Sequence, residues 1–179
     1  NGWFDARYEE ELQFSPISLS YIGRKDRNDE LDDISFEAFK AHLAWKQQTV
    51  ADLDRLFDYD SLSMEEQTSF DIWIYQYERM RGAEDFFYSG LMFDQMNGAQ
   101  SQLPTFLINI HEVDDAEDMT AYIARIKAVG PYMRTALNNA KRTSALGVTT
   151  PGFALDGVIE QSKAILSGAP FAANESTGA

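Results

Sequence analysis

The stretch SFEAFKAHLAWKQQTVADLDRLF, residues 35–57, decides the fold class of this 179-residue chain. Its apolar residues recur at steps of three and four, which places them on one face of a helix of about six turns. Ser35 is a favourable N-cap for this helix. Lys46 fills the one step of the stripe that lacks an apolar residue. The stripe consists of Phe36, Phe39, Leu43, Val50, Leu53 and Phe57.

The same helical spacing is found upstream. Apolar residues four apart predict a short amphipathic helix over residues 4–12, with Glu9–Glu11 pointing away from its apolar side. Ser15 and Pro16 end this helix and start a brief new turn, with serine as N-cap and proline at the first helical position. Residues 23–33, GRKDRNDELDD, are predicted to form a solvated charged loop.

Downstream of the long helix, Ser63 and Glu66 have the spacing of a capping box, so a third helix is predicted from residue 64 to about residue 93. Its aromatic residues lie on several faces, which is typical of a helix buried on several sides. Residues 94–104 are predicted to be a loop. Asn97-Gly98 favours a turn there, because both residues tolerate positive φ.

The C-terminal half predicts three more helices. A helical stripe (Met119, Tyr122, Ile123, Ile126) predicts the first. Gly130-Pro131 is expected to break it and to start the second, which ends with Gly147 as its C′ residue. Thr150-Pro151 begins the last helix, which ends at Gly168, and residues 169–179 predict a flexible polar tail. The apolar face of the last helix consists of Leu155, Val158, Ile159, Ser162, Ile165 and Leu166.

No segment alternates between apolar and polar residues as strands do. The chain is therefore predicted to be all-α, with about six or seven mostly antiparallel helices. Residues 1–179 are expected to form one helical domain, or part of one that continues as a larger helical protein.

The composition excludes several classes of function. The chain has 15 basic and 29 acidic residues, a net charge of -14, which disfavours nucleic acid and anionic membrane surfaces as partners. The absence of cysteine excludes disulfides, thiolate zinc sites and a cysteine nucleophile. No run of about 18 apolar residues predicts a transmembrane segment.

The stretch INIHEVDD, residues 108–115, contains the first half of the zinc-protease pattern H-E-x-x-H. Asp115 stands where the second histidine would be needed. Asp114 and Glu117 have the spacing of an acidic capping box at the start of a helix, so His111 is expected to precede that helix. The sequence therefore predicts no metal ligand and no catalytic residue in this chain.

The segment FDQMNGAQSQLPTFL, residues 93–107, is the remaining candidate for a site. Gln95, Asn97 and Gln100 are uncharged polar residues grouped around a glycine turn between two apolar helices. Such side chains can line a substrate cleft and hydrogen-bond a ligand. An ordinary loop between helices accounts for the same residues, and both interpretations stay open.

Four segments in this order resemble the N-terminal part of the bacterial domain-of-unknown-function family 885. They are RYEEELQFSPISLSYIG, LSMEEQTSFDIWIYQYE, the run from FDQMNGAQSQLP to IARIKAVGPYM, and GVTTP. The resemblance implies a mainly helical fold and a lipid-anchored or secreted protein of the cell envelope or periplasm. Members are longer, and their later portion carries an H-E-x-x-H helix like that of zinc metallopeptidases. No residue of this chain matches that motif.

Two hypotheses follow. The first is an N-terminal helical support part of a zinc-metallopeptidase-like envelope protein, with zinc and the peptide substrate bound elsewhere in the parent. An apolar helix face should then be exposed, or covered by the downstream part or by another copy of the chain. The second is a self-contained acidic helical module for binding or scaffolding, without catalysis.

Overall fold

The computed structural model describes residues 2–167, and this part of the chain contains seven α-helices, two short 3-10 helices and no strand. The predicted all-α class is therefore confirmed. Residue 168, expected to end the last helix, and the expected tail at 169–179 lie outside the described residues. The elements are α1 (Gly2–Leu12), α2 (Pro16–Tyr21), α3 (Phe36–Leu56), η1 (Tyr59–Ser61), α4 (Met64–Ala83), η2 (Glu84–Ser89), α5 (Ala99–Asn109), α6 (Ala116–Ala145) and α7 (Gly152–Ser167).

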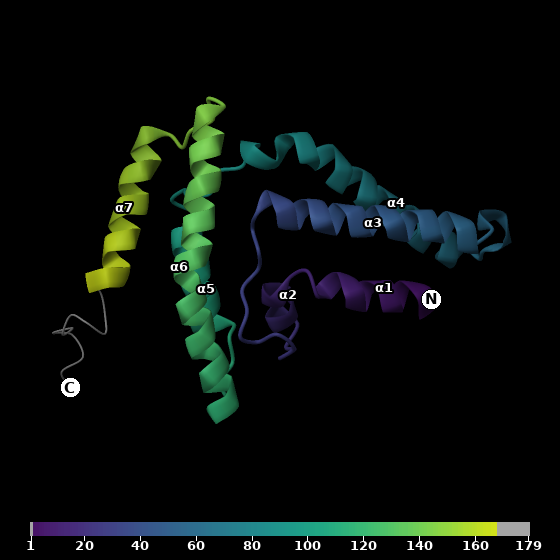
Figure 1. Ribbon diagram of the computed structural model, residues 1–179, viewed down its shortest axis with the longest axis horizontal. Coiled ribbons are helices and arrows are strands. Elements are labelled where there is room, and N and C mark those ends of the chain that lie inside the picture. The colour runs from purple at the N-terminus through teal and green to yellow at the C-terminus, as the bar shows by residue number, and fades with distance from the viewer. Residues whose placement is uncertain (1, 168–179) are drawn as a thin grey trace.

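The helices form two parts that meet at an angle (Figure 1). Helices α1, α3 and α4 lie side by side in an elongated arm, with the N-terminus toward its free end. Helix α6 crosses the inner end of the arm, and α5 packs against both α6 and α7. Helix α2 and the loop after it lie at the junction.

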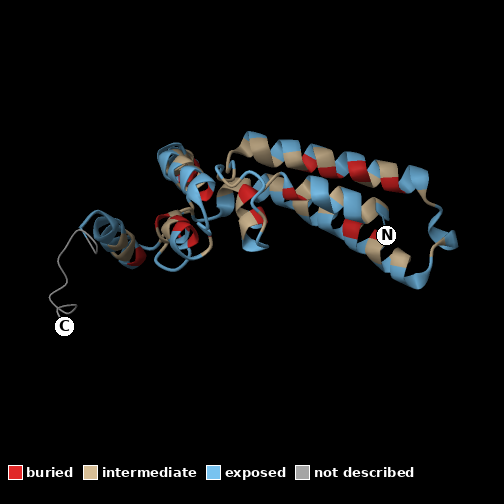
Figure 2. Ribbon diagram, turned by 90° about the horizontal axis from the view of Figure 1, so that it is seen from below, coloured by how far each residue is buried: buried red, intermediate tan, exposed pale blue. Residues whose placement is uncertain are grey.

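Each part has its own hydrophobic core. In the arm, Leu53, Phe70 and Trp73 are buried and pack against Trp3 and other aromatic residues. In the second part, Leu103, Phe106 and Leu107 are buried under residues of α6. Figure 2 shows the buried residues on the inner faces of the helices and long exposed outer faces. The split core explains the extended shape, since no single centre gathers all seven helices.

The predicted helix ends are largely confirmed. Ser35 accepts a hydrogen bond from the backbone N–H of Ala38, and Ser63 and Glu66 form a complete capping box. The Ser15 side chain caps α2, with proline at its first position. Gly147 follows α6 with φ +83°, the left-handed conformation expected of a C′ glycine.

The third helix is shorter than predicted. Helix α4 ends at Ala83, and the chain continues as the 3-10 segment η2 instead of helix to residue 93. Within η2, the Phe87 ring lies 5.1 Å from the Phe36 ring and 5.2 Å from the Phe39 ring. Packing against the start of α3 therefore draws these aromatic residues away from the axis of α4, which local spacing cannot reveal.

The loop predicted for residues 94–104 is also shorter, because α5 begins at Ala99 and includes Pro104. Gly98 is the N-cap, with φ -67°, so positive φ is not the reason for glycine here. A Cβ atom at Gly98 would lie 2.6 Å from the backbone N and O of Asp94. Close approach of two backbone segments requires the glycine.

The predicted break at Gly130-Pro131 is wrong, since α6 runs without interruption from Ala116 to Ala145. Proline removes the backbone hydrogen bond to the carbonyl of Lys127. Both Pro131 and Lys127 are exposed, so water can take the place of the missing donor. Core contacts of Val129 and Tyr132 hold the helix on both sides of the proline.

Most of the predicted apolar stripe of α6 faces outward, and of its four residues only Tyr122 packs against the core. Met119, Ile123 and Ile126 are 45%, 45% and 48% exposed. The buried face carries Arg125 and Asn139 instead. On α7 the predicted apolar face is likewise exposed at Leu155, Ile159, Ile165 and Leu166. None of the helices over residues 2–167 is both long and apolar enough to span a membrane.

Candidate functional site

His111 is a buried structural residue in the turn between α5 and α6. Its Nδ1 atom lies 2.7 Å from Nη1 of Arg125. A guanidinium has no acceptor, so Nδ1 accepts this bond and the imidazole proton is on Nε2. Nε2 lies 3.4 Å from the carbonyl oxygen of Asp118. Both ring nitrogens are therefore engaged within the protein.

Arg125 fastens the loop of residues 23–33 to the rest of the fold. Its guanidinium is completely buried and donates to the carbonyls of Glu30 and Pro16 and to Oδ1 of Asn28. It also lies over the Phe106 ring, 5.0 Å from the centroid. Most residues of the predicted charged loop are exposed, as expected of a solvated loop, but Asn28 and Glu30 also anchor it to one buried cation.

The cap of α6 is shifted by one residue from the prediction. Asp115, not Asp114, is the N-cap, and its carboxylate accepts from the N–H groups of Glu117 and Asp118. Asp118 in turn accepts from the N–H of Asp114. Lys25 forms ion pairs with both Asp114 and Asp118. The hydrogen bond from Lys25 is the main reason that the pKa of Asp118 lies below its usual range.

This turn does not fit a zinc ion. A zinc ligand needs a free imidazole nitrogen, and those of His111 face Arg125 and Asp118. Asp115, at the position of the missing histidine, is committed to capping α6. Across residues 2–167 there is no group of three or more His, Cys, Asp or Glu side chains arranged to hold a metal ion.

The three predicted cleft residues lie where α5 meets α7. Gln100 is buried, and its Nε2 donates to the carbonyl of Asp94 and to Oε1 of Gln161. Gln161 donates in return to the carbonyl of Gln95. Asn97 is exposed, and its backbone N–H donates to the Asp94 carboxylate. Gln100 and Gln95 thus hold α7 against the turn before α5 through hydrogen bonds. A role of these residues in binding substrate stays a prediction.

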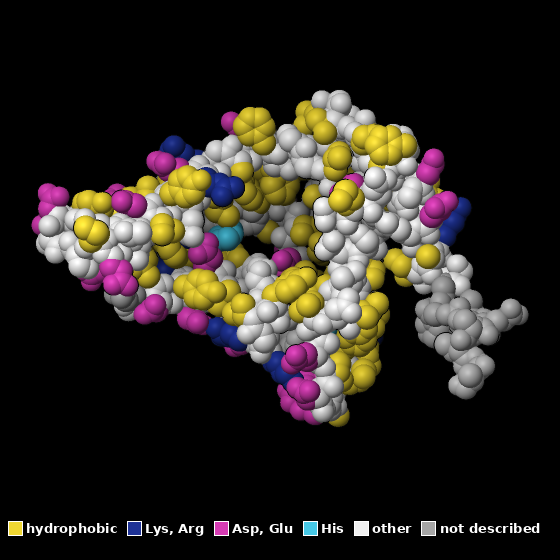
Figure 3. Space-filling view, turned by 180° about the vertical axis from the view of Figure 1, so that it is seen from behind, with side chains coloured by type: hydrophobic (Ala, Val, Ile, Leu, Met, Phe, Trp, Pro, Cys, Tyr) yellow, Lys and Arg dark blue, Asp and Glu magenta, His cyan; other side chains and the backbone are white. Residues whose placement is uncertain are grey.

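A cavity of about 530 Å³ lies at the junction of the two parts. Helices α1 and α2, the loop at residues 32–35 and the start of α3 line it, together with Phe87 and Met92. Figure 3 shows the hollow between the two parts, with hydrophobic side chains on its walls and a histidine at its margin. We name it the junction cavity.

One wall of the junction cavity is backed by a buried ion pair. The Glu11 carboxylate accepts from Nζ of Lys46 at 2.9 Å and lies 3.3 Å from Nε2 of His42. Lys46 is 1% exposed and lies 3.3 Å from the centroid of the Trp73 ring. Burial alone would raise the pKa of Glu11, but the bonds to His42 and Lys46 outweigh it and lower the pKa. Glu11 is therefore charged at neutral pH.

Another wall carries Asp32. Its carboxylate accepts from the backbone N–H of Ile17 and from the Ser15 hydroxyl. Burial raises the pKa of Asp32, and these bonds and the nearby Arg125 only partly offset that effect. Asp32 is followed by exposed Asp33, whose carboxylate accepts from the N–H of Ser35. The cavity therefore gathers three carboxyl groups from two segments.

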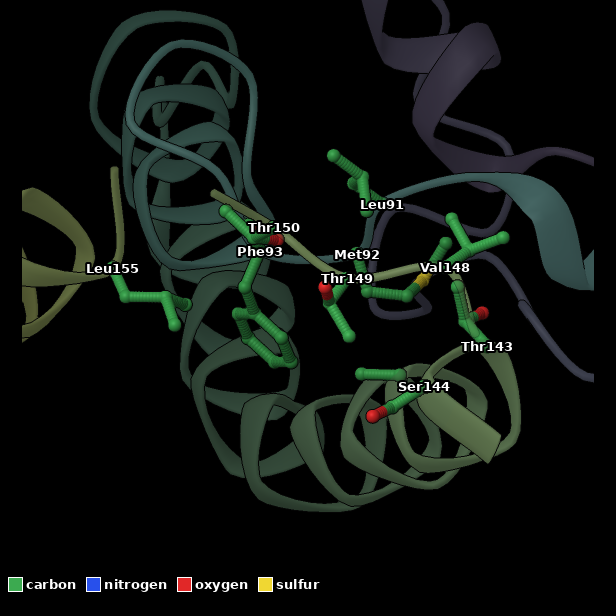
Figure 4. A pocket seen from close by; sticks show the side chains of 10 residues that line it. Leu91, Met92, Phe93, Thr143, Ser144, Val148, Thr149, Thr150 and Leu155 are labelled. Atoms are coloured by element: carbon green, nitrogen blue, oxygen red, sulfur yellow. The ribbon is translucent and has the colours of Figure 1, made fainter. Parts of the chain in front are cut away.

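A smaller cavity of about 190 Å³ lies where the end of α6 approaches residues 91–93 (Figure 4). Its walls are mostly apolar, with the Thr149 and Ser144 hydroxyls beside them. Thr150 donates to the carbonyl of Phe93, which closes one side. This cavity contains no charged residue and offers little chemistry.

Among the charged groups at the junction, only Lys46 is marked in the sequence, by its place in an apolar stripe. No local pattern identifies Glu11 as its partner, since the two residues are 35 positions apart. The His42 side chain is partly exposed and stacks on the Phe14 ring, with the two ring centroids 4.3 Å apart.

Comparisons with known proteins give one match. The family described as bacterial protein of unknown function (DUF885) matches residues 16–179, which is most of the chain. No curated protein and no solved structure matches the chain.

Proposed function

Because the chain belongs to the DUF885 family of bacterial proteins of unknown function, we propose that it is the helical support part of a zinc-metallopeptidase-like envelope protein. In this proposal the zinc ion and the peptide substrate bind to other helices of the parent protein. The described residues provide a rigid scaffold and one wall of the substrate cleft, through Gln95, Asn97 and Gln100.

The observation that carries the proposal is the exposed apolar surface of α6 and α7. Ile123 and Ile126 on α6 and Ile159 and Leu166 on α7 are 45%, 48%, 51% and 81% exposed. A row of exposed apolar side chains along a helix marks a place where another element packs. Additional helices of the same protein are the simplest cover, since both stripes have the spacing by which helices pack.

Zinc-dependent hydrolysis by the product of the complete gene tests the proposal. We expect it to cleave an unstructured protein such as casein, to lose this activity in a chelator and to regain it with zinc. Absence of cleavage, or cleavage unaffected by full removal of metal, contradicts the proposal. Cell fractionation tests the location, since recovery in the cytoplasm contradicts an envelope protein.

A second candidate is an acidic helical binding module without catalysis. The junction cavity favours it, because this cavity is formed entirely by described residues and carries three carboxyl groups. The protein encoded by the complete gene distinguishes the two candidates. A peptidase would hydrolyse peptides, whereas a binding module would bind its ligand and release it unchanged.

A further inference from the structure

We infer that the junction cavity is a binding site for a small organic cation, an amine attached to an apolar group. The carboxylic acids that line it are Glu11, Asp32 and Asp33, and its lining contains neither lysine nor arginine. The site lies apart from the exposed stripes of α6 and α7. The inference therefore stands or falls independently of the zinc-peptidase proposal.

The walls of the cavity suit the apolar part of such a ligand. Phe14, Phe39, Phe87 and Tyr8 contribute aromatic rings. Aromatic faces attract cations as well as apolar groups, and the attraction grows when water is excluded. A cavity of about 530 Å³ is within the range of pockets that hold small molecules.

The charges around the cavity are not equivalent, and this decides where an ammonium group is best placed. Glu11 already forms an ion pair with Lys46, and its carboxylate lies 3.3 Å from Nε2 of His42. The positive charge of Arg125 attracts Asp32, and the Asp32 carboxylate already accepts hydrogen bonds from Ile17 and Ser15. Asp33 receives a hydrogen bond only from the Ser35 N–H among the described contacts, and it is exposed. The ammonium group is therefore expected at Asp33, with the apolar body against the rings.

Two probes of similar size and opposite charge test the inference on the full chain. Phenethylamine presents an ammonium group and 3-phenylpropionate a carboxylate on the same ring. Titration followed by amide NMR shifts should show phenethylamine binding at least about tenfold more tightly. The shifted amides should include those of Ser35 and Ala38, which line the cavity.

Matched variants complete the test. Asp33→Asn keeps the acceptor for the Ser35 N–H and removes the charge, so we expect it to weaken phenethylamine binding by about threefold or more. Asp54→Asn removes an exposed carboxylate on α3 outside the cavity and should leave binding unchanged. Phe14→Leu tests the aromatic wall and should also weaken binding.

Three results would overturn the inference. One is equal affinity for the amine and the carboxylate, which would show a merely apolar surface. Another is no binding of either probe to a folded chain. The third is equal weakening by Asp33→Asn and Asp54→Asn, which would show general attraction to an acidic protein. Far-UV circular dichroism of each variant separates loss of binding from loss of fold.

Discussion

Arg125 and His111 form a buried hydrogen bond of 2.7 Å, in which the guanidinium donates to Nδ1 of the imidazole. This bond joins α6 to the turn before it, and the same guanidinium holds the carbonyls of Glu30 and Pro16. A proton on Nδ1 would remove the acceptor and place two cations in contact. The imidazole of His111 must therefore stay neutral to keep its hydrogen bond with Arg125.

The first prediction concerns pH. Burial and the charge of Arg125 lower the pKa of His111 below its ordinary value of 6.5. The unfolded chain therefore takes up a proton at a higher pH than the folded chain. The stability that neutral His111 contributes is present above pH 6.5 and is lost as the pH falls through the folded pKa.

Urea unfolding at pH 7.5 and 5.5 measures this effect. We expect the unfolding free energy of the natural chain to be lower at pH 5.5 than at pH 7.5. Below pH 6.5, the contribution of His111 falls by up to about 1.4 kcal/mol for each pH unit. His111→Gln lacks the titrating group and should show a smaller fall. The same fall in both proteins would mean that other groups cause the pH dependence.

The second prediction concerns the buried lysine. Glu11→Ala leaves the Lys46 ammonium buried against Trp73 without its carboxylate. Removing one partner of a buried ion pair costs about 3–5 kcal/mol, and Glu11 is partly exposed, so we expect about 2–4 kcal/mol in urea unfolding. Glu78→Ala, at an exposed position on α4, should change stability by less than about 0.5 kcal/mol. Equal small effects would contradict a stabilising role for this pair.

The third prediction concerns Gln100. Gln100→Ala removes the donor to Asp94 and Gln161 and should destabilise the contact of α5 with α7 by about 1–3 kcal/mol. Amide hydrogen exchange should become faster in α7. Asn97→Ala is the control, since this exposed side chain can be removed without loss of its backbone bond to Asp94. Unchanged exchange in α7 of the Gln100 variant would show that the amide contacts do not hold that helix.

The fourth prediction concerns the exposed stripe of α7. In the product of the complete gene, Ile159→Asp should cost more than about 2 kcal/mol if other helices cover this face, because a charge would be buried without a partner. Lys163→Asp, at another exposed position of α7, should cost less than about 0.5 kcal/mol. Similar small costs for both would show that the Ile159 face stays in water.

The fold class follows from the sequence because local signals specify helices well. The caps at Ser35, Ser63 and Gly147 depend on neighbouring residues only, and the structure confirms each of them. The break predicted at Gly130-Pro131 failed because tertiary packing holds α6 together at modest cost.

The assignment of the buried face of α6 was harder. Apolar spacing selected Tyr122, which packs against the core, but also Ile123 and Ile126, which are exposed. The side turned inward carries Arg125, which binds carbonyls from two distant segments. A sequence shows that an arginine is present but not that carbonyls from residues 16 and 30 meet it. The partners of Lys46 were hidden for the same reason, as was the junction cavity.

The most direct test of the account is the zinc content of the product of the complete gene, measured together with that of its His111→Gln variant. In the proposed function, zinc binds outside the described residues and His111 has a structural role. We therefore expect one zinc ion per chain in both proteins. Absence of zinc from the natural protein, or loss of zinc on substitution of His111, would contradict it.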